Sequence, residues 1–374
     1  MHRRDVLKLG ATLTSAGMLG LPWPRHGFAD SRSLRERADA KGLVFGCAVK
    51  SPQLGTDMPY TDLIATQANM LVHEYELKRK NVEPSPGQYV FAGADKAMNF
   101  AADNGQAVRG HTLCWFQANP DWLEDALMVP VAQREQLLIS YIDRVIDRYG
   151  SRMQSWDVVN EVIEPQQADW NGMRTDNPWW RALGERHIDI AFHAAKEKAG
   201  EAKLYLNDYS VENDVRWNED RRNTTLRLLE RLKKRDVPIE GYGIQGHLKP
   251  YRDRFEPEVF AKFLRELEGF GLQVMVTEFD VADVDGPADP AERDADIAAV
   301  TKSFLDTALD SPACAGVLCW GITDEYSWLS DLEKYKRADG TKTRGLPYDD
   351  QYRPKPMWDA IAAALDAAPA RVPT

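Results

Sequence analysis

Eight short runs of β-forming residues recur along the chain, and longer amphipathic segments separate them. Because a helix between two strands returns the chain to the end where the first strand began, successive strands of this kind lie parallel in one sheet. The predicted strands span residues 44–49, 70–76, 108–115, 156–161, 203–209, 242–248, 273–280 and 317–323. Eight alternating units are typical of a closed barrel, so the pattern predicts the α/β class and a single (β/α)8 TIM barrel.

The segments between these runs have the apolar spacing of helices that pack on a sheet. Apolar residues three and four positions apart run from Leu138 to Tyr149, and Gly150 then stops the helix. Residues 260–267 repeat this spacing. The segment 164–180 is instead long and polar and carries three tryptophans, so we expect an elaborated loop on the face of the barrel that holds residue 161.

The first 29 residues are predicted to be a signal peptide. Arg3 and Arg4 precede a weakly apolar run that is too short and too rich in Gly, Ser and Thr to span a membrane, and residues 27–29 offer a small-residue cleavage site. The pattern resembles a twin-arginine export signal, which implies a periplasmic or secreted protein with no membrane anchor after maturation. A disordered basic terminus is the alternative. Residues 30–374 then form one domain, expected to be a monomer.

Two of the predicted strands carry a glutamate at or near their carboxyl end. Val158 and Val159 lead into Asn160 and Glu161, and a similar run ends in Glu278, 117 residues later. The carboxyl ends of barrel strands meet on one face, so we expect the two glutamates to face each other. A retaining glycosidase needs such a pair about 5–5.5 Å apart, one as acid/base and one as nucleophile. A strand-end carboxylate also caps helices or pairs with arginine, and this structural interpretation stays open for each stretch alone.

Other polar and aromatic side chains stand at the ends of the remaining strands. They are Glu74, Lys78, His111, Trp115, Tyr209, Gln245, His247, Asp280, Trp320 and Trp328. Eleven tryptophans favour a sugar site, although tryptophan also fills protein cores. The net charge of −11, with no basic stripe, argues against nucleic acid as a partner. No His or Cys cluster has metal-ligand spacing, so no metal and no cofactor are expected.

Five motifs in this order resemble glycoside hydrolase family 10. They are residues 110–115 (GHTLCW), 156–161 (WDVVNE), 243–247 (GIQGH), 277–280 (TEFD) and 320–324 (WGITD), the last followed by 326–328 (YSW). The resemblance runs from about residue 40 to residue 356. It implies a (β/α)8 barrel and a retaining endo-β-1,4-xylanase whose substrate is xylan or a related oligosaccharide.

The resemblance also implies residue roles. Glu161 would be the acid/base and Glu278 the nucleophile, kept ionised by a hydrogen bond from His247, which Asp280 holds. The charge of Glu278 would raise the pKa of Glu161. Asn160 would bond the sugar 2-hydroxyl. Hydroxyl-binding roles fall to Glu74, Lys78, His111 and Gln245, and stacking roles to Trp115, Trp320, Trp328 and Tyr209. His111 and the aromatic residues have a core interpretation as the alternative.

Four positions depart from the family pattern: Tyr75, Arg79, Phe116 and Ala118. Tyr75 stands where the family usually has asparagine, which puts the substrate preference in doubt. These departures motivate the alternative of a glycosidase of the same mechanism that acts on another β-glucan or on short oligosaccharides. A non-catalytic carbohydrate-binding barrel is a separate alternative, against which the presence of both Glu161 and Glu278 argues.

The four cysteines are too few for a disulfide framework. Cys47 and Cys114 are expected to be buried free thiols, and a bond between Cys314 and Cys319 stays open.

Overall fold

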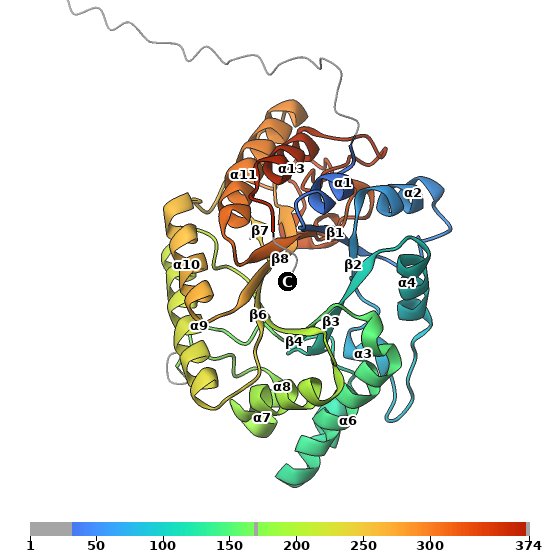
Figure 1. Ribbon diagram of the computed structural model, residues 1–374, viewed down its shortest axis with the longest axis vertical. Coiled ribbons are helices and arrows are strands. Elements are labelled where there is room, and N and C mark those ends of the chain that lie inside the picture. The colour runs from blue at the N-terminus through green and yellow to red at the C-terminus, as the bar shows by residue number, and fades with distance from the viewer. Residues whose placement is uncertain (1–31, 168–170, 372–374) are drawn as a thin grey trace, which may run out of the picture. The chain divides into compact units, whose positions relative to one another are not determined.

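The strands form a closed parallel barrel in the computed structural model, which describes residues 32–167 and 171–371. Their order is β6-β5-β4-β3-β2-β1-β9-β8-β7, and pairing of β6 with β8 closes the ring (Figure 1). The bounds are β1 Val44–Val49, β2 Met70–His73, β3 Ala107–Cys114, β4 Ser155–Asn160, β5 Lys203–Asp208, β6 Gly241–Ile244, β7 His247–Leu248, β8 Gln273–Val281 and β9 Cys314–Cys319. The (β/α)8 barrel predicted from the sequence is thereby confirmed.

One predicted strand differs from the structure. The run over residues 242–248 is broken into β6 and β7, with Gln245 and Gly246 between them. Gly246 has φ +78°, a left-handed conformation that favours glycine, and its N–H donates to the carboxylate of Glu212 at 3.0 Å instead of to a strand. Gln245 therefore follows the carboxyl end of β6, and His247 begins the separate strand β7.

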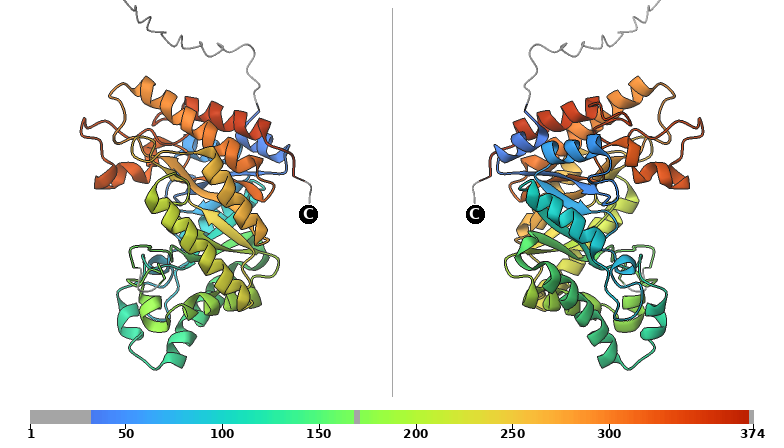
Figure 2. Two further views of the ribbon diagram at one scale, coloured as in Figure 1. Left: turned by 90° about the vertical axis from the view of Figure 1, so that its left-hand side faces the viewer. Right: turned by 90° about the vertical axis from the view of Figure 1, so that its right-hand side faces the viewer.

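Helices surround the ring of strands (Figures 1 and 2). Their bounds are α1 Leu34–Asp39, α2 Met58–Gln67, α3 Arg79–Val82, α4 Ala92–Asp103, α5 Trp122–Ala126, α6 Val131–Tyr149, α7 Pro178–Leu183, α8 Arg186–Lys198, α9 Arg216–Lys234, α10 Pro257–Gly269, α11 Pro290–Asp310, α12 Trp328–Asp331 and α13 Pro356–Ala367. α6 and α10 bury the apolar faces that the spacing predicts, and Gly150 ends α6 with φ +52°. None of the helices in the described part of the chain is long and apolar enough to cross a membrane.

The loop predicted over residues 164–180 is shorter than expected. Asn177 caps α7 by accepting a hydrogen bond from the N–H of Trp179, and Pro178 occupies the first turn, where its missing N–H costs nothing. Trp179 is buried, so it belongs to the core and not to the site. Trp170 lies outside the described residues.

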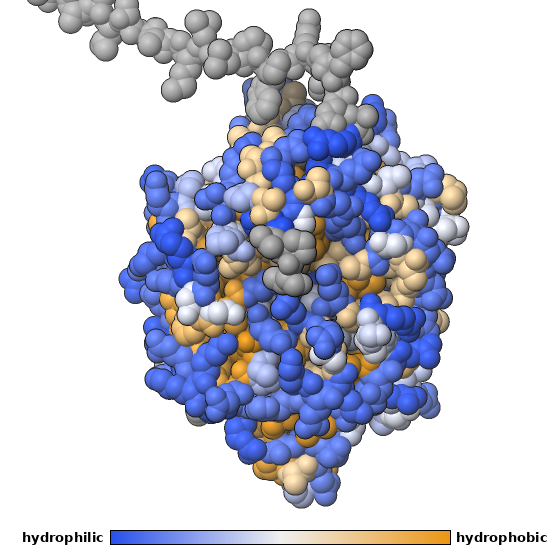
Figure 3. All heavy atoms as spheres, in the orientation of Figure 1, coloured by the Kyte–Doolittle hydropathy of each residue, from blue (hydrophilic) through white to orange (hydrophobic). Residues whose placement is uncertain are grey.

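Apolar side chains fill both layers of the molecule. A large cluster packs between the strands and the helices, and a smaller one, with Met275 and Leu318, lies inside the barrel. The barrel interior also holds a buried ion pair, in which Arg109 Nε donates to Asp157 Oδ2 at 3.1 Å beneath the ring of Tyr205. Figure 3 shows one face of the protein, on which hydrophilic side chains dominate and hydrophobic ones gather in small groups.

The cysteines are all buried and free. Cys314 and Cys319 are the first and last residues of β9, and five residue steps along an extended strand separate them by about 16 Å. A disulfide requires Cα atoms within about 7 Å, so the two cannot pair in this fold.

Candidate active site

A cleft of about 570 Å³ lies at the carboxyl ends of the strands. Figure 2 shows the orange-red segment that follows β9 projecting from one side of the barrel. Ten of the residues singled out in the sequence line this cleft: Lys78, His111, Trp115, Glu161, Tyr209, Gln245, His247, Glu278, Trp320 and Trp328. Glu74, Asn160 and Asp280 are buried behind its wall.

Glu278 is held by two side-chain hydrogen bonds. Asn207 Nδ2 donates to its Oε1 at 2.8 Å, and His247 Nε2 lies 3.4 Å from its Oε2. Burial alone would raise the pKa of Glu278, but the bond with His247 and the charges of His111 and His247 outweigh it and leave the pKa lowered. The side chain is therefore built to stay ionised.

His247 owes its donor role to Asp280. Its Nδ1 lies 2.9 Å from Asp280 Oδ1, and the indole of Trp328 donates to the other oxygen of that carboxylate. Burial would lower the pKa of the imidazole, but the negative charge of Asp280 prevails and raises it to about 10. A protonated ring donates from both nitrogens, so His247 donates to Glu278 and Asp280 together.

Glu161 has the opposite electrostatic setting. Burial, followed by the negative charges of Glu278 and Asp208, raises its pKa, while the hydrogen bond from Gln245 opposes the shift. Gln245 Nε2 donates to Glu161 Oε1 at 2.9 Å. The backbone of Glu161 has φ +58° and is held by Asn207 O, which accepts its N–H at 2.9 Å. Burial therefore contributes more to the raised pKa than the charge of Glu278, the one cause predicted from the sequence.

Two asparagine amides connect the glutamates. Asn160 Nδ2 donates to Glu161 Oε1 at 3.1 Å, and Asn160 Oδ1 accepts from Asn207 Nδ2 at 2.8 Å. Because the same Asn207 nitrogen donates to Glu278, an unbroken set of hydrogen bonds runs from one carboxylate to the other. Thr277 Oγ1 fixes the Asn207 amide by donating to its oxygen at 2.7 Å.

Asn207 was not assigned a role from the sequence, although its place at the end of the fifth strand was the available signal. The position opposite it must be glycine, because a Cβ built on Gly243 would lie 2.0 Å from Asn207 Oδ1.

Arg174 was also missed. It donates to Glu161 O at 2.9 Å and to the Tyr209 hydroxyl at 2.7 Å from a loop with no regular pattern that would have revealed it.

A cation and several aromatic rings form the wall on the β2–β3 side. Lys78 Nζ lies 4.9 Å from the ring centre of Tyr75, 5.1 Å from that of Trp115 and 5.8 Å from that of Trp320. Burial lowers the pKa of Lys78, and the charges of Glu278, Glu74 and Glu161 oppose that shift. The ammonium group is thus held between aromatic faces and within reach of the carboxylates.

His111 stands on the buried ion pair of the barrel. Its Nδ1 lies 3.0 Å from Asp157 Oδ2, and its ring centre is 5.3 Å from that of Trp320. His111 is nearly inaccessible to solvent and yet lines the cleft. Both interpretations of the sequence therefore apply: one end of the ring is buried in the barrel, and the other faces the cleft. Asp157, which the sequence analysis did not single out, orients it.

Glu74 lies apart from the cleft surface. It is buried, its Oε1 accepts no hydrogen bond within the described residues, and Lys50 Nζ approaches it at 3.5 Å. Burial raises the pKa of Glu74 to about 7, against the charge of Lys50. The structure therefore does not place this predicted hydroxyl-binding residue on the cleft wall.

The departures from the family pattern have different consequences. Tyr75, 41% exposed, lines the cleft. Phe116 also lines it and supports Arg174, whose guanidinium lies 4.0 Å from its ring centre. Ala118 has φ +50° and accepts a backbone hydrogen bond from Lys80. Arg79 is buried against Tyr141 and pairs with a nearby glutamate, so it contributes to the core only.

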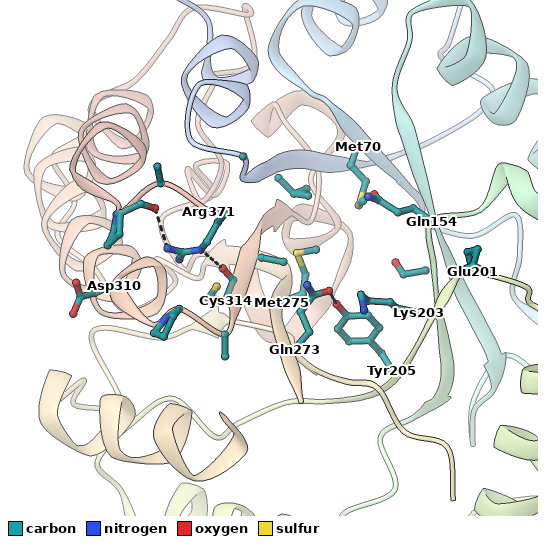
Figure 4. Close-up of a pocket in the computed structure, with 18 residues that line it drawn as sticks. Met70, Gln154, Glu201, Lys203, Tyr205, Gln273, Met275, Asp310, Cys314 and Arg371 are labelled. Carbon is teal, nitrogen blue, oxygen red and sulfur yellow. Dashed lines mark hydrogen bonds between the residues drawn. The ribbon is translucent and has the colours of Figure 1, made fainter. Parts of the chain in front are cut away.

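A second hollow, of about 630 Å³, lies at the opposite end of the barrel (Figure 4). Its lining includes the first residues of β1, β2, β4, β5, β8 and β9, and Arg371 closes one side by donating to carbonyls of Cys314 and Leu309. Barrel enzymes place their chemistry at the other face. Within residues 32–167 and 171–371, no group of three or more His, Cys, Asp or Glu side chains is arranged to hold a metal ion.

The chemical capacity of the cleft follows from its two glutamates. The raised pKa of Glu161 favours a carboxylic acid that can donate a proton, and the lowered pKa of Glu278 favours a carboxylate that can attack as a nucleophile. Hydrogen bonds through two amides hold both in one site. Carboxylic acid and carboxylate together perform acetal hydrolysis, the reaction of glycosidases.

Comparisons with known proteins agree with this chemistry. The model of glycosyl hydrolase family 10 matches residues 33–364. The chain is 33% identical to a thermostable celloxylanase of Thermoclostridium stercorarium, over 80% of each chain, and 31% identical to endo-1,4-beta-xylanase 1 of Humicola insolens, over 90% of this chain and 75% of that one. Xylanase 10B of Thermotoga petrophila RKU-1, solved in complex with xylobiose, superposes with a TM-score of 0.80 at 28% identity, covering 91% of this chain and 99% of that one. The protein is thus a member of glycosyl hydrolase family 10.

Proposed function

We propose that the protein is a retaining endo-β-1,4-xylanase that cleaves internal bonds of xylan. The observation that carries this proposal is the pair of glutamates with opposite pKa shifts in one cleft. Membership of a glycoside hydrolase family gives the reaction type, and relatives named as xylanases give the substrate class.

In the proposed first step, ionised Glu278 attacks the anomeric carbon while Glu161 protonates the leaving-group oxygen. His247 and Asn207 keep the attacking carboxylate ionised and oriented through the two bonds already described. The product is a covalent glycosyl-enzyme, and the leaving sugar departs with the proton of Glu161.

In the second step, Glu161 removes a proton from a water molecule, which releases the sugar from Glu278. Esterification removes the negative charge of Glu278, one of the influences that raise the pKa of Glu161. The same side chain is therefore a better acid before the intermediate forms and a better base afterwards. Asn160 is proposed to bond the 2-hydroxyl of the sugar during both steps.

The sugars themselves are proposed to bind against the aromatic walls. Trp115, Trp320 and Trp328 would flank the sugar that is attacked, and Tyr209 would lie under the leaving sugar. Lys78, His111 and Gln245 supply hydroxyl-bonding groups within the same cleft. A relative named endo-1,4-beta-xylanase supports an endo-acting enzyme.

The test is incubation with xylohexaose while the anomeric protons of fresh product are followed by NMR. Early appearance of the β-anomer is the expected result, with the Glu278→Gln variant as the inactive control. Early α-anomer would contradict the retaining mechanism. Absence of cleavage in the folded protein would contradict the xylanase proposal.

A second candidate substrate is another β-linked glucan or a short xylo-oligosaccharide. Tyr75, which lines the cleft where the family usually has asparagine, favours it, and one relative is named a celloxylanase. Relative rates on xylan, carboxymethylcellulose and short xylo-oligosaccharides separate the two candidates.

We also propose that residues 1–29 are a twin-arginine signal peptide and that the mature protein, residues 30–374, is a monomer that acts in the periplasm or outside the cell. Support comes from Arg3 and Arg4, the apolar run that follows and the start of the family match at residue 33. Replacing Arg3 and Arg4 by lysine should keep the enzyme in the cytoplasm of a producing bacterium. Unchanged export would contradict the signal.

A further inference from the structure

A side hollow of about 300 Å³ adjoins the catalytic cleft at Tyr75. It lies between the residues that follow β1, the residues that follow β2 and the start of α4. Of the described residues that line the cleft and the side hollow, Tyr75 alone belongs to both. Its side chain is therefore the partition between the two cavities.

The backbone of Tyr75 is held on both sides of its side chain. Its carbonyl accepts hydrogen bonds from Asn81 Nδ2 at 2.7 Å and from the N–H of Lys78 at 3.0 Å. Its N–H donates to Glu76 Oε2 at 3.2 Å, and the other oxygen of that carboxylate accepts the N–H of Ser51 at 2.6 Å. These bonds connect the ends of β1 and β2 to α3, so the backbone presents the ring at one place between the cavities.

Two ammonium groups lie near the ring of Tyr75. Lys78 Nζ lies 4.9 Å and Lys50 Nζ 5.7 Å from its centre. Of the two cavities, Lys78 lines the cleft and Lys50 lines the side hollow, so the ring separates the two cations. Lys50 Nζ also lies 3.7 Å from Asp331 Oδ2 on α12. This contact extends the partition from the β2 end to the segment that follows β9.

Glu74 lies behind the partition. It is 2% exposed, and its Oε1 accepts no hydrogen bond within the described residues. Neither Glu74 nor Lys50 is among the residues that line the cleft, although a carboxylate and an ammonium group both bind sugar hydroxyls well. Burial raises the pKa of Glu74 to about 7, while the charge of Lys50 and a hydrogen bond with Tyr75 oppose the shift. The tyrosine thus reaches the carboxylate that it covers.

The position of Tyr75 relates it to one end of the substrate. Tyr75 follows β2 and Tyr209 follows β5, three strands away around the ring, so they stand towards opposite ends of the cleft. In the proposed function Tyr209 lies under the leaving sugar. Trp115 and Trp320, which share Lys78 with Tyr75, flank the sugar that is attacked. Tyr75 therefore borders the place of the next sugar, on the non-reducing side of the attacked one.

We infer that Tyr75 is a specificity-determining residue that keeps this next sugar away from Glu74 and Lys50. The enzyme then binds its substrate chiefly through the attacked sugar and the leaving sugars. The inference rests on the proposed function and adds to it where along the substrate the binding energy arises. A xylan chain still passes over the partition, because Tyr75 is 41% exposed, so cleavage within the chain is retained.

The test compares two substrates with the same leaving group. On the non-reducing side of the cleaved bond, p-nitrophenyl β-xyloside places one sugar and p-nitrophenyl β-xylobioside places two. The ratio of kcat/KM on the xylobioside to kcat/KM on the xyloside measures what the second sugar contributes, because the bond that breaks is the same. A hydrogen bond to a charged group changes an equilibrium constant by roughly tenfold or more. The native ratio should therefore stay below about ten, and Tyr75→Ala, which opens Glu74 and Lys50 to the cleft, should raise it about tenfold.

Further variants assign the change to the ring. Tyr75→Phe keeps the ring and should keep the native ratio. Tyr251→Ala, which removes a tyrosine that bonds Asp296 outside the cleft, should also keep it. Glu74→Gln added to Tyr75→Ala should reduce the gain, because the newly accessible acceptor loses its charge.

The outcomes that would overturn the inference are equally specific. Circular dichroism establishes that each variant is folded, and Tyr75→Asn is a second small variant with the same expected gain. An unchanged ratio in these variants would reject the partition, and a lowered ratio would mean that the ring supports the second sugar. A gain in Tyr75→Phe equal to that in Tyr75→Ala would assign the effect to the hydroxyl and reject the role of the ring.

The same assay separates this inference from the proposed function. Cleavage of either xyloside by the native protein tests the xylosidic reaction, whereas the change in ratio tests Tyr75. If neither xyloside is cleaved, the xylanase proposal is contradicted, and the ratio is measured with p-nitrophenyl β-glucoside and β-cellobioside, the pair for the second candidate substrate. A ratio that rises in Tyr75→Ala with the cleaved pair supports the partition. A native protein that cleaves only the substrate with two sugars would overturn it.

Discussion

Removal of the Asn207 amide tests the hydrogen-bond network most directly. Asn207→Ala deletes the donor that lies 2.8 Å from Glu278 Oε1 and leaves His247, at 3.4 Å, as the remaining side-chain partner. A hydrogen bond to a charged group contributes about 1.5–3 kcal/mol, and one pH unit corresponds to about 1.4 kcal/mol. The pKa of Glu278 should therefore rise by roughly one to two units.

The sign of the effect on activity follows from the role of the ionised form. The lowered pKa of Glu278 means that activity is present above this pKa and is lost as the pH falls through it. In Asn207→Ala the acidic limb of the kcat/KM profile should move towards neutral pH by the same one to two units, roughly. At pH values above the shifted limb, kcat/KM should be reduced less than at pH values below it.

The assay is the initial rate of xylohexaose cleavage across the acidic range, with circular dichroism at each pH. Thr277→Val, which frees the Asn207 amide without removing it, should shift the limb in the same direction by less. Tyr205→Phe removes a partly buried hydrogen bond from the Tyr205 hydroxyl, also on β5, to Gln273 at the far end of the barrel, so it controls for general destabilisation. An acidic limb that stays in place in folded Asn207→Ala would refute the claim that this amide stabilises the ionised nucleophile.

Three further perturbations address the remaining parts of the site. Gln245→Ala removes a hydrogen bond that lowers the pKa of Glu161. The alkaline limb of the kcat/KM profile, where Glu161 loses its proton as the pH rises, should therefore move up by about one pH unit. A downward shift of this limb would contradict the assignment. Glu161→Ala should spare aryl glycosides with good leaving groups about a hundredfold more than xylan, because only a poor leaving group needs protonation, and equal losses measured on both would argue against an acid role. Asp280→Asn should lower the pKa of His247 from about 10 and with it the rate, and an NMR titration of the ring that shows no change would reject the coupling.

Most of the barrel could be predicted because its signals are local. Strand and helix periods repeat along the chain, and stop signals such as Gly150 act within one turn of their helix. The break between β6 and β7 escaped because it depends on Gly246 in a left-handed conformation and on Glu212, which lies far away in the sequence. Trp179 was expected in a loop but lies buried in α7, because its burial depends on residues outside the polar segment that carries it.

The glutamates and most cleft residues could be placed because strand ends in a barrel converge by topology alone. The residues that shift the pKa values of the glutamates could not be placed from the sequence. Asn207 differs from an ordinary strand-end asparagine only through the three side chains it contacts, and Arg174 reaches the site from an irregular loop.

The amide path between the two glutamates has a consequence for protein engineering. Because Asn207 contacts Glu278 and Asn160, and Asn160 contacts Glu161, a substitution at either asparagine perturbs both titrations at once. Both limbs of the pH profile would then change together, so neither could be adjusted independently at these positions. Residues that reach one carboxylate only, such as His247 on the nucleophile, are the positions at which an alkaline- or acid-tolerant variant is best sought.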